Sequence, residues 1–403
     1  MAGAFYARGV ERQRLRPQVI LLGLMSLLND SASEMIYPLL PVFLTSTLGA
    51  TPIIVGLIEG TADALSSILK LAAGWISDRL PHRKPLIIGG YALAAASRAW
   101  ISMAAQWPSV LGARLLDRTG KGIRSAPRDA MIADVTPFES RGKAFGFQRA
   151  LDHTGAVIGP LFAIVLLDAF HLPLRTVFLI AVIPGAVGIV FLIALLREEP
   201  HSTTQPRDLA TPQPRNLPPP FFYALGSIAL FSLANSSDAF LLLQAHAAGV
   251  SIGMLPVLWS AHHVIKSLFS TYAGARSDVM GRRSLLVIGW MVYAAIYFVF
   301  PFAKSLPIFV ILFVAYAIPF TLTEGAERAW IGDLVPAELR GRSFGFYYLV
   351  TGLFVLAGTA LFGVLYQDVS PRVAFMTGAA LALTAALSVI AGKGRTSPQS
   401  AAR

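Results

Sequence analysis

The chain has 403 residues, of which 55% are hydrophobic and only 14% are charged. This balance excludes an ordinary soluble protein, in which about 25% of residues are charged. There is no cysteine, which excludes disulfides and cysteine-based metal or redox chemistry. The net charge of +11 would suit a nucleic-acid binder, but membrane topology explains most of it, so we expect no nucleic-acid partner.

Apolar segments of about 20 residues, the length that crosses a ~30 Å hydrocarbon core, recur along the whole chain. A basic tail precedes the first of them, and we expect this segment to be a retained span rather than a cleaved signal. The predicted spans are 18–45, 53–77, 86–104, 109–134, 144–168, 176–197, 221–245, 252–276, 285–303, 307–333, 343–367 and 372–391. They predict an all-α membrane protein with twelve transmembrane helices.

When the end residues of each span are counted with the adjoining loops, 20 Lys/Arg lie on the loops and tails of one membrane face and three on the other. The positive-inside rule therefore predicts that both termini are cytoplasmic. No loop is long enough for a catalytic domain, so we expect no enzyme. The predicted organisation is an N-terminal tail (1–17), a six-helix bundle (18–197), a Pro-rich cytoplasmic linker (198–220), a second six-helix bundle (221–391) and a C-terminal tail (392–403).

The two bundles repeat each other in sequence. The segment Asp134-Val-Thr-Pro-Phe-Glu-Ser-Arg-Gly-Lys returns 199 residues later as Asp333-Leu-Val-Pro-Ala-Glu-Leu-Arg-Gly-Arg. Gly74-x-x-x-Asp78 likewise returns as Gly274-x-x-x-Asp278, and a basic cluster follows each copy. Two parallel repeats predict pseudo-symmetric bundles that rock about a site between them.

These residues resemble a known family. Gly74-Trp-Ile-Ser-Asp78-Arg79-Leu-Pro-His-Arg83-Lys84 is similar to the signature of the major facilitator superfamily (MFS) on the loop between spans 2 and 3, and Gly274 to Arg283 is its second copy. The resemblance implies the MFS fold and secondary active transport by alternating access. It also implies a monomer in the lipid bilayer that takes a small-molecule substrate and protons, is driven by the proton gradient and needs no cofactor.

The signature predicts a latch at the cytoplasmic side. The two glycines permit close helix approach. Arg79, Arg83 or Lys84 would reach Asp134, and Arg282 or Arg283 would reach Asp333. The alternative is a basic loop that only orients the chain. With a possible cross-half pair of Arg128 and Glu327, the gating candidates are Gly74, Asp78, Arg79, Arg83, Asp134, Arg128, Asp278, Arg282, Glu327 and Asp333.

Between their first and last residues the predicted spans contain ten Lys/Arg and ten Asp/Glu, and each charge is costly in lipid unless it is paired or hydrated. Asp117, Lys121, Arg124 and Arg128 share one face of span 4, whereas spans 1 and 2 carry mostly acids. We predict a buried network of these three spans, which is either static or functional. In the functional reading, carboxylates change protonation, and the proton-coupling candidates are Asp30, Glu34, Asp63 and Glu59.

The functional reading also predicts a substrate site. Arg124 or Lys121 would bind an acid of the protein and an anionic group of the substrate in turn. The substrate-binding candidates are Arg124, Lys121, Arg118, Asn29, Arg149, Asp152, His263, Asp238 and Glu324. Neighbouring histidines on a helix point about 100° apart, so we expect no metal site at His246, His262 and His263. A proton relay or a substrate hydrogen bond suits His263 better.

The direction of transport is suggested by span 5. Gly155-Ala-Val-Ile-Gly159-Pro160 resembles the start of a pattern typical of the family's proton-coupled antiporters, although close helix packing around a proline kink explains it equally well. The resemblance to the bacterial drug–proton antiporter-like branch favours efflux across the inner membrane. The charged first bundle favours a small polar solute or drug, anionic or zwitterionic. The alternatives are a proton-coupled importer of an organic anion or siderophore, and a transporter-like receptor or scaffold without transport.

Overall fold

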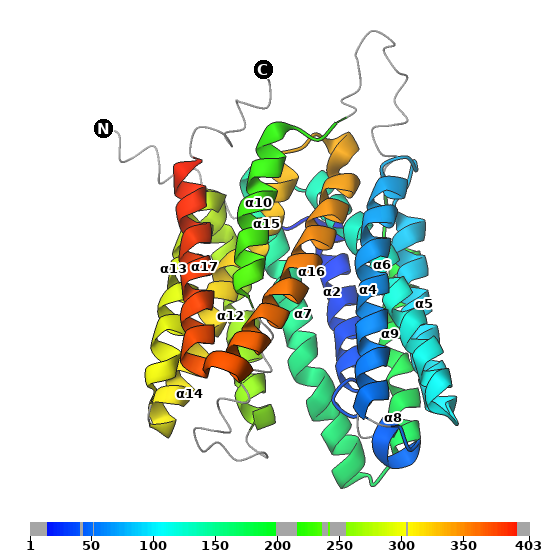
Figure 1. Ribbon diagram of the computed structural model, residues 1–403. Coiled ribbons are helices and arrows are strands. Elements are labelled where there is room, and N and C mark those ends of the chain that lie inside the picture. The colour runs from blue at the N-terminus through cyan, green and yellow to red at the C-terminus, as the bar shows by residue number, and fades with distance from the viewer. Residues whose placement is uncertain are drawn as a thin grey trace.

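A computed structural model describes residues 14–40, 43–50, 52–198, 216–235, 241, 255–303 and 305–392. Every regular element within these ranges is a helix, as Figure 1 shows. Most of the predicted linker, both chain ends and the later part of the predicted seventh span lie outside the described residues. Asp238 and His246 therefore lie outside them as well, and so does the side chain of Glu59.

In the first half (residues 14–198) the main helices are α2 (Pro17–Glu34), α4 (Pro52–Ser77), α5 (Lys84–Met103), α6 (Trp107–Val135), α7 (Arg141–Ile164), α8 (Leu174–Ile180) and α9 (Val182–Leu195). Short helices of other types are η1 (Phe43–Thr47), η2 (Phe138–Ser140) and η3 (Val165–Ala169). Ala181 divides the predicted sixth span into α8 and α9. The first α-helix ends at Glu34, well before the predicted end of its span at residue 45, and turns follow it.

In the second half (residues 216–392) the main helices are α10 (Pro219–Ala234), α12 (Leu255–Met280), α13 (Arg282–Val299), α14 (Leu306–Ala315), α15 (Ala317–Asp333), α16 (Arg340–Val364) and α17 (Pro371–Ala391). They are joined by η6 (Phe300–Phe302), η7 (Ala337–Leu339) and η8 (Leu365–Val369). Tyr316 divides the predicted tenth span into α14 and α15.

Apolar composition alone identifies only part of this bundle. Among the described residues, 7 helical segments are long and apolar enough to cross a membrane. The helices α2, α4, α6 and α12 are not among them. These four carry charges such as Asp30, Asp63, Lys121 and Lys266 in their interiors. The helices that fail the apolar test therefore carry part of the buried charge of the bundle, and α7 and α15, which pass it, carry Arg149 and Glu324.

Glycine permits very close packing of α4 on α16 and of α12 on α7. A Cβ atom at Gly74 would lie 2.9 Å from the carbonyl carbon of Gly341 and 3.2 Å from Cα of Gly345. A Cβ atom at Gly274 would lie 2.7 Å from the carbonyl carbon of Gly142. Any larger residue would force these backbones apart. Both pairs join one half of the molecule to the other.

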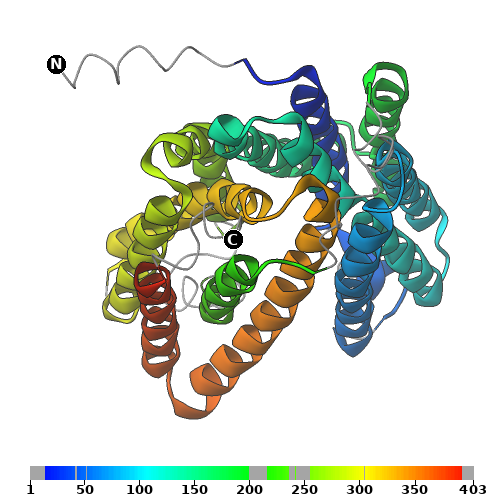
Figure 2. The same ribbon diagram turned by 90° about the horizontal axis from the view of Figure 1, so that it is seen from above.

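The helices α7 and α16 cross from one half to the other (Figures 1 and 2). Near its start each packs on the opposite half, as the contacts of Gly146 with α12 and of Gly345 with α4 show. Further along, each packs on its own half: Gly159 lies against α2, and Gly358 lies against α10. These contacts between the halves thus gather near the starts of the two helices.

We call the end of the bundle formed by the α4–α5, α6–α7, α12–α13 and α15–α16 connections the motif end. A buried apolar core, which includes Phe145 and Phe344, joins the two halves towards this end. A separate apolar core, which includes Phe43 and Phe178, lies within the first half alone. In Figure 1 the halves meet at the upper, motif end and separate at the lower end.

Candidate functional site

One latch at the motif end centres on Asp78. Its carboxylate accepts hydrogen bonds from the backbone N–H groups of Gly341 and Arg342, each at 2.7 Å, at the start of α16. The Arg83 guanidinium forms ion pairs with Asp78 at 3.4 Å and with Asp134 at 3.3 Å. Arg340 also donates to Asp134 at 2.6 Å. Four charged side chains therefore bind α4 and α6 to the first turn of α16.

A second latch repeats this arrangement around Asp278. Its carboxylate accepts from the backbone N–H groups of Gly142 and Lys143, each at 2.8 Å, at the start of α7. Arg282 pairs with Asp278 and, at 3.1 Å, with Asp333. Arg141 also pairs with Asp333, at 2.7 Å. The sequence repeat is thus reproduced contact by contact.

Both latches use the same physical principle. The first N–H groups of a helix have no partner within the helix, and its N-terminus is partially positive, so a carboxylate binds there well. Burial raises the pKa of Asp78 to about 6, while Arg83 and the two N–H groups of α16 act to lower it. The latch therefore has a desolvation cost that its hydrogen bonds and ion pairs offset only in part.

Other predicted gating residues lie elsewhere. Arg79 stacks on the ring of Trp75, 3.1 Å from its centroid, instead of reaching Asp134. Lys84 donates to carbonyl oxygens at the end of α9, one of them Leu196 at 2.7 Å. The suggested pair of Arg128 and Glu327 is not formed.

The partners of Arg128 and Glu327 are close neighbours instead. Arg128 pairs with the adjacent Asp129 at 3.0 Å. Glu327 accepts from the Tyr347 hydroxyl, also at 3.0 Å. Arg128 on α6 and Glu327 on α15 thus each have another partner, and they do not pair with each other.

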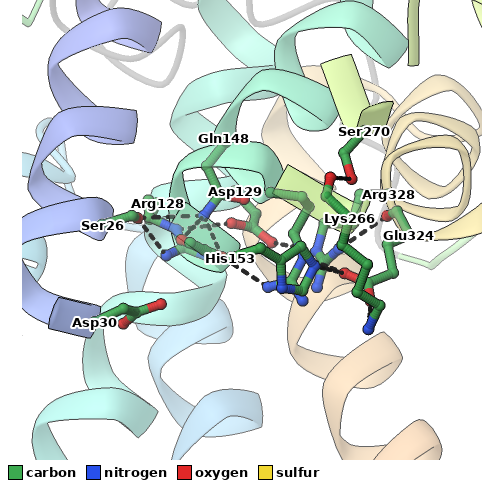
Figure 3. Close-up of polar contacts among 12 residues, drawn as sticks. Ser26, Asp30, Arg128, Asp129, Gln148, His153, Lys266, Ser270, Glu324 and Arg328 are labelled. Carbon is green, nitrogen blue, oxygen red and sulfur yellow. Dashed lines mark hydrogen bonds and ion pairs between the residues drawn. The ribbon is translucent and has the colours of Figure 1, made fainter. Parts of the chain in front are cut away.

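A cluster of charges connects the halves deeper in the bundle (Figure 3). Glu324 on α15 pairs with Arg149 on α7, with Lys266 on α12 at 3.1 Å and with His153 at 3.3 Å. His153 also lies 3.2 Å from His263, ring nitrogen to ring nitrogen. One carboxylate of the second half therefore holds two side chains of α7.

A second cross-half contact lies at Asp129 on α6. This buried carboxylate pairs with Arg328 on α15 at 3.3 Å and accepts from the Tyr348 hydroxyl on α16. The cross-half ion pair of α6 and α15 is thus formed by the residues adjacent in sequence to the suggested ones, Arg128 and Glu327. Sequence patterns place a residue on a helix face only to within about one position. They are therefore compatible with the pair of Asp129 and Arg328 as well as with the pair of Arg128 and Glu327.

A polar cavity of about 180 Å³ lies within the first half, between α2, α5 and α6. The sequence analysis expects a site between the halves, but every residue that lines this cavity belongs to the first half. Its charged lining residues are Asp30, Glu34, Arg98, Arg114, Asp117, Arg118, Lys121 and Arg124. Five cations and three acids leave a formal excess of two positive charges.

Several of these cations are held in fixed positions. Arg98 donates to Asn29 Oδ1 at 2.7 Å and to Ser33 Oγ at 2.9 Å. Arg118 pairs with Asp63 on α4 at 3.0 Å. Arg124 donates to the carbonyl oxygen of Gly90 at 3.2 Å. Such preorganised cations suit an anionic group of a solute, because little ordering cost remains on binding.

The three carboxylates of the cavity, Asp30, Glu34 and Asp117, differ in whether they form an ion pair. Asp117 pairs with Arg114 at 3.4 Å. Within the described part of the chain, Asp30 and Glu34 have no Lys or Arg nitrogen in ion-pair contact. Asp30 accepts only from the side-chain amide of Asn29, at 3.0 Å, and Figure 3 shows it apart from the inter-half cluster. A carboxylate without an ion pair in a largely enclosed site is suited to change its protonation.

The predicted site residues therefore separate into two groups. The cavity is lined by Asn29, Asp30, Glu34, Arg118, Lys121 and Arg124, and Asp63 is not a lining residue but pairs with Arg118. The inter-half cluster contains Arg149, Asp152, His263 and Glu324, since Asp152 pairs with Arg149 at 2.7 Å. No group of three or more metal-ligating side chains occurs in the described ranges.

Sequence reasoning missed several functional candidates. Arg98 and Arg114 line the cavity but were not proposed as site residues. Two sequence features could have identified them: Arg98 is a lone cation in an otherwise apolar span, and Arg114 is a cation one helix turn before Asp117. Arg141 and Arg340 were missed in the latches although they occupy matching positions of the repeat. Comparing the two repeat copies position by position would have identified that pair.

Comparison with known proteins places the chain among relatives of similar length. The model of the Major Facilitator Superfamily matches residues 22–261 and 221–402. An uncharacterized MFS-type transporter of Methanocaldococcus jannaschii is 31% identical over 381 residues, which cover 93% of this chain and 94% of the relative. The multidrug resistance protein MdtH of Edwardsiella ictaluri is 33% identical over 127 residues, 31% of each chain.

Solved structures show the fold. The human organic anion transporter MFSD10 (TETRAN) superposes with a TM-score of 0.75 at 15% identity, over 93% of this chain and 100% of the other. At this identity the likeness shows the fold alone. It confirms the predicted all-α architecture of twelve helices in two six-helix bundles.

Proposed function

The chain belongs to the Major Facilitator Superfamily, and we propose that it exports a small zwitterionic organic solute across the inner membrane in exchange for protons. As a member of this family it is a multi-pass secondary transporter, and the expectation that it is not an enzyme is confirmed. The motif end is the cytoplasmic end in this proposal, with both chain termini on that side. The molecule is then closed to the cytoplasm.

The observation that carries the proposal is the cavity of the first half. It combines an excess of two positive charges with two carboxylates, Asp30 and Glu34, that lack an ion pair among the described residues. The cations bind the anionic group of the solute by charge-assisted hydrogen bonds. The volume of the cavity, 180 Å³, is below the roughly 300–1,000 Å³ of drug-sized sites. This favours a small polar solute over a bulky lipophilic drug.

The charge of the solute decides the direction of coupling. An ammonium group of a zwitterion binds an ionised carboxylate and so competes with a proton for Glu34, which couples the two by exchange. A purely anionic solute binds better when Glu34 is protonated, because the cavity is then more positive, and would travel together with protons. Exchange is supported by the partial likeness to a protein named for multidrug resistance, and we adopt it.

Binding to the purified protein tests the site. The probes are glycine, aspartate, succinate and glycerol phosphate, each titrated against the purified chain while its Tm is followed. At least one should raise the Tm. Lys121, exposed at the cavity, is changed to Gln, and Arg98→Gln is the second variant.

Each of these variants should weaken binding by about tenfold or more, since a charge-assisted hydrogen bond contributes about 1.5–3 kcal/mol. The matched control is Arg372→Gln, which removes an exposed guanidinium outside the cavity. Equal binding by wild type, Lys121→Gln and Arg98→Gln would place the solute elsewhere in the molecule.

A further inference from the structure

A second cavity, of about 530 Å³, lies at the motif end of the second half. It is enclosed by the first turns of α13, the last turn of α17 and the end of α15, and α13 and α17 lie side by side at the edge of this half (Figures 1 and 2). Its walls include Val287, Ile288, Leu334, Val389 and Ile390. They are apolar, although the cavity lies beside the charged latch.

The polar part of this cavity carries positive charge. Arg282 and Arg283 line it together with one acid, Asp333, which leaves a formal excess of one positive charge. Arg282 and Asp333 are both members of the second latch. Arg283 lies at the start of α13 and donates to the carbonyl oxygen of Val389 at 3.1 Å. An occupant that fits has one anionic group and an apolar body.

One wall of the cavity belongs to the other half of the molecule. Phe138 of η2, between α6 and α7, lines it from the first half. Arg282 donates to the carbonyl oxygen of Phe138 at 2.6 Å and lies over its ring, 5.7 Å from the centroid. Because this wall belongs to the opposite half, it should move away when the halves separate at the motif end. An occupant that touches Phe138 therefore binds the closed state more tightly and shifts the population towards it.

We propose that this cavity binds an anionic phospholipid of the surrounding leaflet, and that the bound lipid stabilises the closed motif end. The phosphate lies against Arg283, and part of one acyl chain lies along the apolar wall. Ile288 and Ile390, 40% and 50% exposed, continue this wall onto the outer surface of the helices. A lipid chain reaches the cavity along that surface, and basic residues at the ends of membrane helices attract anionic headgroups.

The test compares the wild-type protein in nanodiscs of pure phosphatidylcholine and of phosphatidylcholine mixed with phosphatidylglycerol. The chain has no cysteine, so two introduced cysteines are its only labelling sites. Spin labels at His82→Cys and Val279→Cys, both exposed at the motif end of opposite halves, report the closed fraction. Phosphatidylglycerol should raise the ratio of closed to open molecules by about fivefold or more.

Two variants separate this site from a general effect of surface charge. Ile288→Trp fills the half-exposed side of the cavity, and Arg283→Gln removes its charge without touching the latch pairs. Both should lose most of the lipid effect. Arg276→Gln removes an exposed charge of α12 outside the cavity and should retain it.

Three results would overturn the proposal. The closed fraction could be the same with and without phosphatidylglycerol. The lipid effect could persist undiminished in both cavity variants, which would assign it to the bilayer as a whole. Alternatively, sodium decanoate added to phosphatidylcholine nanodiscs could raise the closed fraction where phosphatidylglycerol does not, which would identify the occupant as a soluble amphiphile.

Discussion

Single carboxylates control how the halves of this molecule meet. Asp78 and Asp278 bind the first N–H groups of α16 and α7, and Glu324 holds Arg149 and Lys266 from opposite halves. In each case one side chain has partners on helices far apart in the sequence. Removing one carboxylate should therefore change the equilibrium between conformations more than an average surface substitution does.

The closed state should depend on pH through Asp78. Its pKa is about 6 in the closed molecule and should be near 3.9 once the halves separate and water reaches it. The closed state thus binds this proton more tightly. Its stabilisation from Asp78 is fully present below about pH 4 and is lost as the pH rises through about 6, with a slope of up to about 1.4 kcal/mol per pH unit.

The closed fraction of spin-labelled protein, measured between pH 4 and 8, checks this sign. Asp78→Asn has no titrating group at this position, so its closed fraction should lack the component between pH 4 and 6. A closed fraction that instead rises with pH in the wild type would show that the Asp78 carboxylate is more stable in the latch than in water.

Glu324 should matter more than its neighbour Glu327. Glu324→Gln leaves Arg149, Lys266 and His153 without the charge that they share, at a cost on the order of 2–3 kcal/mol in unfolding free energy. Glu327→Gln keeps an oxygen that accepts from Tyr347 and is the matched control one helix turn away. Thermal unfolding should give a lower Tm for the first variant than for the second, and equal Tm values would remove Glu324 as a link between the halves.

At the scale of helices, the glycines of α4, α7, α12 and α16 decide how closely the halves approach. Gly274 lies against Gly142 and Gly146, and Gly74 lies against Gly341 and Gly345. These contacts place the start of each crossing helix beside the aspartate that caps it. Helix packing and latch formation are therefore one event.

Gly274→Ala tests this coupling. The added Cβ would collide with the backbone of Gly142, so the helices must separate at a cost of about 1–3 kcal/mol. The closed fraction at the motif end should fall accordingly. Gly226→Ala on α10 is the control, because nothing lies within 4 Å of the added atom. If both variants keep the wild-type closed fraction, close helix approach does not determine closure.

The helices follow from the sequence more directly than the site does. Apolar length and the 199-residue repeat at Asp134 and Asp333 place the spans because these signals are local or internal to the chain. The breaks at Ala181 and Tyr316 were not predicted, although Pro184 and Pro319 each follow three residues later and remove the hydrogen bond to the last residue of α8 and of α14.

The partners of individual side chains could be identified only from the structure. Sequence spacing placed Arg128 on the correct helix and Arg79 on the correct loop, but it could not decide between a partner across the interface and a neighbour such as Asp129 or Trp75. Arg98 reaches the cavity from α5 because that helix packs on α6, and the lone cation in its apolar span indicates a buried role but not which helix it contacts. The cavity is a product of helix packing, which a one-dimensional pattern does not contain.

In the whole molecule, the candidate site in the first half is connected to the latch between the halves. In the proposed mechanism the cavity of α2, α5 and α6 binds the solute and the exchanged proton, and α6 also carries Asp129 and Asp134, which contact the second half. A change of charge in the cavity is thus close to the contacts that must break when the transporter opens. This predicts that proton movement depends on solute and on the unpaired carboxylates.

The direct measurement is proton flux in proteoliposomes that contain a pH-sensitive dye. Amino acids, dicarboxylates and organophosphates are added outside in turn, and Glu34→Gln, Asp30→Asn and the control Asp168→Asn, an exposed acid outside the cavity, are compared with wild type. We expect at least one zwitterionic solute to make the lumen more alkaline as it enters. This response should be lost in the first two variants and kept in the third. A response that persists unchanged in both cavity variants, or no proton movement with any solute, would contradict the account, and acidification by an anion would reverse its direction to import.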